Sequence, residues 1–102
     1  MNLQRLAWKC TQEVITTLGE PTMQSLEWHM SQSGISMVPE EFDIKRFHAA
    51  LYELMGDGAD IIMELVAKQM AEELEISADY DKGLIGIERV LRLFEIAEKV
   101  KG

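Results

Sequence analysis

The sequence lacks the features that hold small secreted proteins together or place a chain in a membrane. Cys10 is its one cysteine, so no disulfide can form within the chain. Its apolar runs are short, as at Ile61-Ile62-Met63, whereas a helix needs about 20 apolar residues to cross a bilayer. The first residues lack the apolar centre of a secretory signal. We therefore expect a cytoplasmic protein that makes no contact with membranes.

Residues that interrupt regular structure are also scarce. Two prolines and seven glycines in 102 residues leave long uninterrupted stretches, which favours helices over many short strands. The hydrophobic fraction of 47% is too high for a disordered chain and is typical of a globular one. The length matches one domain of ordinary size, so the sequence predicts a single helical domain over residues 1–102.

Basic residues are few, with 10 Lys and Arg against 18 Asp and Glu, and the formal net charge is −8. Because non-specific nucleic-acid binding depends on neutralising phosphates with basic side chains, we expect no nucleic-acid partner. The charge is uneven: residues 20–81 hold three basic and fourteen acidic residues, and both ends are slightly positive. This pattern is typical of solvated helix faces, or of ends that pack against the acidic middle of the same chain or of a second copy.

Apolar residues recur every three or four positions in five segments, which is the spacing of one helix face. This periodicity predicts helices at about 2–18, 21–31, 43–55, 58–75 and 84–100. Residues 35–39 are interpreted as an extended crossing segment that buries Ile35 and Val38. The expected fold is therefore all-α, a compact bundle of about five helices whose last helix could also pack between subunits.

Several residues mark where the predicted helices begin and end. Gly19 suits the position after a helix, since glycine adopts positive φ easily. Asp43 and Asp57 each precede an apolar repeat and could cap a helix with their carboxylates. Gly83 and Gly86 weaken the start of the fifth helix.

Large apolar residues define the helix faces expected in the core. The segment 58–75 is the richest, which predicts a central position for this helix. Its expected buried residues are Ile62, Leu65, Val66, Met70 and Leu74, widened by Ile61 and Met63. In the segment 84–100 the expected residues are Leu84, Ile87, Leu91 and Phe94, flanked by Val90 and Ala97.

Residues that could perform chemistry are not arranged in known patterns. His29, His48 and Cys10 lack metal-ligand spacing, and Cys10 falls on an apolar helix face, which favours a core role over a nucleophilic one. The acidic pairs, such as Glu72-Glu73, lie in polar runs near helix ends. We therefore predict no catalytic residues, no metal and no cofactor, and a chain that is not an enzyme.

Interaction through protein contacts is the leading functional hypothesis. Trp8 and Trp28 lie beside the apolar faces rather than on them, and large aromatics that are half outside a small core are typical of interfaces. With Ile87, Leu91 and Phe94 they are the predicted contact residues, and the predicted partner is another protein, most simply a second copy in a homodimer. The seven methionines either fill gaps in the core or line a pocket for a small apolar ligand, which is the alternative function.

One family resembles part of this sequence, over about residues 14–75. The similarity rests on turn and core positions, namely Leu18-Gly19-Glu20, Leu26-Glu27-Trp28-His29-Met30, Gly34-Ile35 and Leu54-Met55-Gly56-Asp57-Gly58-Ala59. This layout resembles the small helical domains of the Nitrosopumilus output domain family of archaea, although the loop at Val38-Pro39 matches only approximately. The resemblance implies an archaeal output or interaction module in signalling or transcription, and it implies no catalytic residues.

Overall fold

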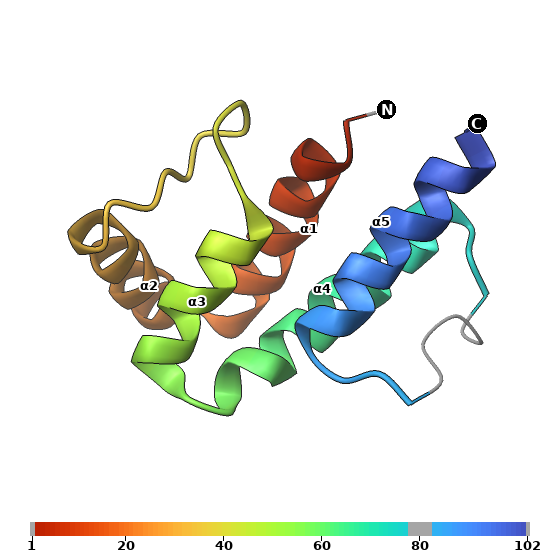
Figure 1. The fold of residues 1–102 in the computed structure, drawn as a ribbon. Helices are drawn as coiled ribbons and strands as arrows, with labels where there is room; N and C mark the ends of the chain where they lie inside the picture. Colours follow the sequence, from red (N-terminus) through yellow and green to blue (C-terminus); the bar gives the residue numbers. More distant parts are fainter. Residues whose placement is uncertain (1, 78–82, 102) are drawn as a thin grey trace.

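Five helices share one apolar core in the computed structural model, which describes residues 2–77 and 83–101 (Figure 1). The helices are α1 (Leu3–Leu18), α2 (Glu20–Gln32), α3 (Ile44–Met55), α4 (Gly58–Leu74) and α5 (Ile87–Lys101). No strand occurs in the described residues. The predicted all-α class and the five helices are therefore confirmed. None of the described helices is long and apolar enough to cross a membrane.

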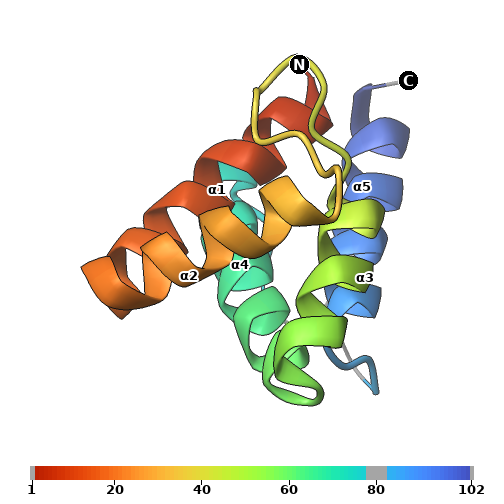
Figure 2. The same ribbon diagram turned by 90° about the vertical axis from the view of Figure 1, so that its left-hand side faces the viewer.

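The helix α4 lies at the centre of the bundle, as its sequence predicts. It packs against α1, α3 and α5, whereas α2 packs against α1 and α3 on the side away from α5, nearest the viewer in Figure 2. Three alanines, Ala59, Ala67 and Ala71, are buried along α4 together with its larger apolar residues. Because alanine has a small side chain, neighbouring helices can approach α4 closely from several directions.

The two predicted aspartate caps behave differently. The Asp43 carboxylate accepts hydrogen bonds from the backbone N–H groups of Lys45 (2.9 Å) and Arg46 (3.3 Å), so this cap is confirmed. Asp57 occupies the position before α4, but its side chain makes no capping bond, and that prediction is wrong. The backbone of Asp57 is already helical, at φ −61° and ψ −19°, whereas a capping side chain needs an extended backbone to fold back.

Two residues expected in the core of α4 lie outside it. Ile61 is 62% exposed and Leu65 is 41% exposed. The buried face of α4 is instead the one that includes the three alanines. A prediction that counts only large apolar residues does not detect these small side chains. The two exposed residues are four positions apart on the helix, so they share one outward face.

Apolar residues are also exposed at helix ends and in the crossing segment. Leu18 at the end of α1 and Leu54 near the end of α3 are exposed. In the crossing segment Val38 is 49% exposed, whereas Ile35 and Met37 pack against the core. The expected burial of Val38 is therefore wrong, because Met37 takes the inward position.

The last helix begins at Ile87, three residues later than predicted, because Gly86 has φ +57° and cannot continue a helix backward. Its most buried residues are Val90 and Leu93. The expected core residues Ile87, Leu91 and Phe94 pack against the core but remain partly exposed. The buried face of α5 is therefore centred on Val90 and Leu93 rather than on these three residues. The predicted start at residue 84 is thus corrected.

Candidate functional site

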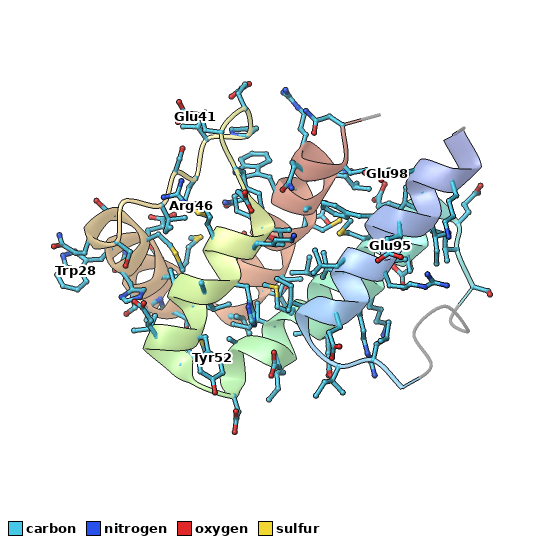
Figure 3. All side chains as sticks on the ribbon, in the orientation of Figure 1. Trp28, Glu41, Arg46, Tyr52, Glu95 and Glu98 are labelled. Atoms are coloured by element: carbon cyan, nitrogen blue, oxygen red, sulfur yellow. The ribbon has the colours of Figure 1, made fainter. Side chains whose placement is uncertain are left out.

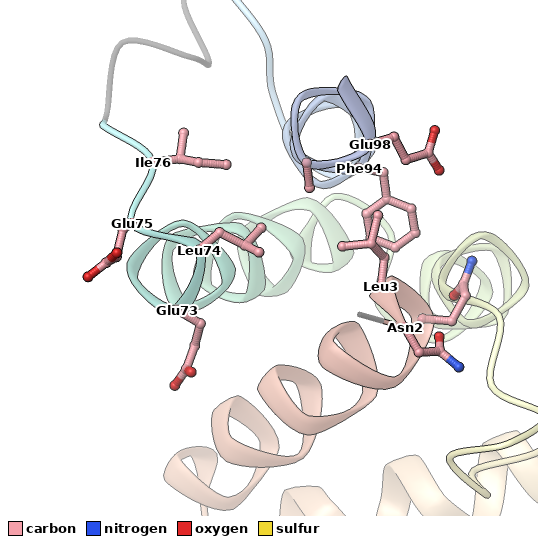
Figure 4. A pocket seen from close by; sticks show the side chains of 10 residues that line it. Asn2, Leu3, Glu73, Leu74, Glu75, Ile76, Phe94 and Glu98 are labelled. Atoms are coloured by element: carbon pink, nitrogen blue, oxygen red, sulfur yellow. The ribbon is translucent and has the colours of Figure 1, made fainter. Parts of the chain in front are cut away.

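An open groove lies at one end of the bundle (Figure 4). It lies between the first turn of α1, the end of α4 and the second half of α5, and its volume is about 690 Å³. Three segments far apart in the sequence therefore meet there.

The end of α4 forms one wall. Glu75 adopts a left-handed backbone at φ 57°, which ends the helix, and the Ile76 N–H donates to the Ala71 carbonyl at 2.9 Å. This pattern of bonds after the last helical turn satisfies otherwise unpaired carbonyls and reverses the chain. As a result Leu74 and Ile76, on either side of the turn, both line the groove.

The start of α1 forms the second wall and is held at two points. The Asn2 side chain accepts a hydrogen bond from the Arg5 N–H at 3.1 Å and caps the helix. The Gln4 side chain accepts from the Ile44 N–H at 3.1 Å, which ties α1 to the start of α3. These bonds fix the position of Leu3, which contributes its side chain to the groove.

The third wall comes from α5, where Phe94 and Ala97 are three residues apart and so share a face. Ala97 leaves space that a larger side chain would fill. Together the apolar lining consists of Leu3, Leu74, Ile76, Phe94 and Ala97.

Among the described residues, the charged side chains that line the groove are acidic: Glu73, Glu75 and Glu98. Figure 4 shows their carboxylates directed outward from the apolar walls. Glu73 pairs with Lys9 of α1 at 3.5 Å. Glu75 and Glu98 have no ion-pair partner among the described residues. The groove thus combines an apolar floor with a negatively charged rim.

The five predicted contact residues do not form one surface. Phe94 lines the groove, whereas Ile87 and Leu91 pack against the core. Trp28 is 66% exposed and projects from α2, on the opposite side of the molecule (Figure 3). Trp8 is half-buried, and its indole N–H donates to the Met37 carbonyl at 2.7 Å, which holds the crossing segment against α1.

Reactive side chains are dispersed or buried. Cys10 is fully buried, and burial, followed by the nearby charges of Glu13 and Glu73, raises the pKa of its thiol to about 11. It is therefore protonated at neutral pH, in agreement with the predicted core role. The His29 Nε2 lies 2.8 Å from the Ala50 carbonyl.

His48 lies in a separate place, where its Nε2 is 3.3 Å from the Asp60 carboxylate. Within residues 2–77 and 83–101, no group of three or more His, Cys, Asp and Glu side chains could hold a metal ion.

Two smaller cavities occur elsewhere. One, of about 320 Å³, lies between α2 and α3 and includes Leu54 and Met55. The other, of about 250 Å³, lies beside the crossing segment and is mainly polar. Met30, Met63 and Met70 are fully buried in the core, and no methionine of the described residues lines the large groove. Met55, by contrast, lines the cavity between α2 and α3.

Sequence reasoning placed Leu74 and Phe94 on apolar helix faces, with Ala97 beside Phe94, but it did not bring the two helices together, and it missed Ile76 and the acidic rim. The available signal was a pair of apolar residues on either side of a helix end, at Leu74 and Ile76. Comparison with protein-family models, with curated proteins and with solved structures finds no match to this chain. The groove is therefore interpreted from its own geometry.

Proposed function

We propose that this chain is a non-enzymatic interaction module that binds a polypeptide partner through the groove between α1, α4 and α5. The observation that carries the proposal is the apolar lining of a groove of about 690 Å³, open to solvent at one end of the bundle. Recognition of an amphipathic segment in such a groove is a common way for helical proteins to bind their partners.

The cellular role, location and oligomeric state of this module are proposed from the sequence. A role as an output module in signalling or transcription-linked regulation agrees with the resemblance to archaeal output domains, and a cytoplasmic location fits that role. A homodimer stays a prediction, and the outward pair Ile61 and Leu65 offers a second apolar surface for it. Light scattering at high protein concentration tests this point, because a strict monomer would contradict it.

The binding proposal is tested by site-specific photocrosslinking. A benzophenone amino acid replaces Ala97 in the groove, and the matched control carries it at Glu53, which is exposed on α3. After irradiation in an extract of the source cells, we expect a discrete polypeptide adduct from position 97 and none from position 53. Adding Leu3→Lys, which places a charge in the groove, should remove that adduct.

Equal adducts from both positions, or none from position 97, would contradict the proposal. An adduct of twice the chain mass would identify the partner as a second copy. The far-UV circular dichroism of each variant shows whether the helices remain formed, so that loss of binding is not confused with loss of fold.

A second candidate function is binding of a small apolar ligand in the same groove. The observation that favours it is the groove volume, which falls within the range of about 300–1,000 Å³ usual for small-molecule sites. Native mass spectrometry of the purified chain tests it, since a bound ligand would add a fixed mass that Ala97→Trp should abolish.

A further inference from the structure

We propose that the groove selects a basic amphipathic helix, that is, a partner segment with apolar residues at positions i, i+3 or i+4 and i+7 and with Lys or Arg beside them. This inference rests on the proposed function and names the chemistry of its partner. Two features of the groove support this inference. Its rim is negatively charged, and its described walls contain no strand edge to which an extended peptide could hydrogen-bond.

Among the described residues, the rim of the groove carries more negative charge than nearby basic side chains neutralise. Three carboxylates line the groove, and Lys9 pairs with Glu73, which leaves Glu75 and Glu98 uncompensated among the described residues. The first turn of α1 adds about +0.5 of a charge through its helix dipole, and the end of α4 adds about −0.5, so the two dipoles cancel. The rim therefore retains about two negative charges for a partner to neutralise.

The whole molecule strengthens this preference. The chain has a net charge of −8, so its long-range field attracts cationic segments and repels anionic ones before contact. Local and global charge thus favour the same partner. An acidic segment would place its carboxylates near Glu75 and Glu98, where like charges repel.

The walls favour a helical partner over an extended one. They are built from the ends and faces of three helices, and the described residues contain no strand edge. An extended peptide obtains much of its affinity by adding backbone hydrogen bonds to such an edge. A helix satisfies its own backbone groups and needs only apolar contacts from Leu74, Ile76 and Phe94.

The experiment uses a displayed library of helical peptides. The apolar positions i, i+3, i+4 and i+7 vary among Leu, Ile, Met and Phe, and the flanking positions are all Lys, all Gln or all Glu. The full chain selects binders, and Leu3→Lys and Ala97→Trp serve as counter-selection. We expect groove-dependent peptides to come from the Lys set and their affinity to fall as salt increases, because exposed charges are screened over about 10 Å at 0.1 M.

Two double variants distinguish the effect of the rim carboxylates on peptide affinity from the effect of the net charge of the chain. Glu75→Gln with Glu98→Gln should weaken the selected peptide by about two- to fivefold for each carboxylate, as for exposed ion pairs. Glu27→Gln with Glu53→Gln removes the same charge from α2 and α3, away from the groove, and should change affinity by less than twofold. Fluorescence anisotropy of the labelled peptide measures both.

The possible failures are distinguishable. Groove-dependent peptides from the Gln or Glu sets, or equal effects of the two double variants, would overturn the basic-helix inference and leave the binding function intact. If no peptide of any set depends on the groove, the basic-helix inference is wrong; the proposed function is wrong as well if position 97 also gives no polypeptide adduct in the photocrosslinking experiment.

Discussion

The substitution Gly86→Ala tests how α5 is joined to the rest of the bundle. Gly86 has φ +57°, and a Cβ atom added there would collide with the Asp60 carboxylate and lie 3.0 Å from the Asp60 Cβ. The positive φ costs a non-glycine residue about 1 kcal/mol. Moving the Asp60 carboxylate aside would also break its 3.3 Å contact with His48, which is partly buried. This second effect adds about 1 kcal/mol.

We therefore expect Gly86→Ala to lower the free energy of unfolding by about 2 kcal/mol, a large fraction of the stability of a small domain. Urea unfolding followed by circular dichroism measures this change, and thermal unfolding should show a decrease in Tm of about 4–8 °C for each kcal/mol. Gly34→Ala is the control, because Gly34 has φ +72° with no atom within 4 Å of an added Cβ. It should cost only about 1 kcal/mol.

A double-mutant cycle isolates the collision. An Asp60→Ala background removes the carboxylate and leaves only the 3.0 Å contact with the Cβ atom of residue 60, so Gly86→Ala should cost little more than the backbone term there. A coupling of about 1 kcal/mol should therefore separate the two backgrounds. An equal cost in both backgrounds would refute the role of Asp60. A neutral Gly86→Ala would refute the geometry of the turn itself.

Two further predictions concern the cap of α3 and the buried thiol. Asp43→Ala should lower the free energy of unfolding by about 1 kcal/mol, because the N–H groups of Lys45 and Arg46 lose their acceptor. Asp43→Asn should retain most of the capping stabilisation, because asparagine also caps helices well. Urea unfolding of the two variants measures both changes, and equal losses of stability would contradict capping. The pKa of Cys10 is raised from 9.0 to about 11 in the folded chain, so the unfolded chain loses its proton first and stability should fall as pH rises between those values. Cys10→Ala should flatten that part of the stability profile, and a profile unchanged by the substitution would show that the thiol does not contribute.

The helices were predictable because each contains an apolar repeat, and because a glycine or an aspartate marks several of their ends, such as Gly19 after α1 and Asp43 and Gly56 on either side of α3. The residues that face the core were harder to predict, for a physical reason. Counting large apolar residues placed Ile61 and Leu65 inside, whereas the buried side of α4 is set by Ala59, Ala67 and Ala71, where other helices come close. Small residues permit close packing of helices but add little to the apolar periodicity of the sequence, so the periodicity does not show which face of the helix they place in the core.

The groove was not predictable for a related reason. It depends on how three chain segments, near residues 2–4, 73–76 and 94–98, are placed relative to one another. Helical periodicity describes each helix by itself and carries no information on where two helix ends meet. The acidic excess of residues 20–81 was visible in the sequence, but its concentration at the groove required Glu98 of α5 to join Glu73 and Glu75.

The shape of the groove depends on residues at the opposite end of α5. Gly86 lies eleven positions before Ala97, about 16 Å along a helix at 1.5 Å per residue. At that distant end the Gly86 N–H donates to the Glu64 side chain at 3.4 Å, and the absence of a Cβ lets the backbone lie against Asp60. Because a helix behaves as a stiff rod over three turns, the way its first turn meets α4 sets the distance of Phe94 and Ala97 from Leu74. We therefore expect the packing of Gly86 against α4 to influence the width of the groove that we propose for the partner.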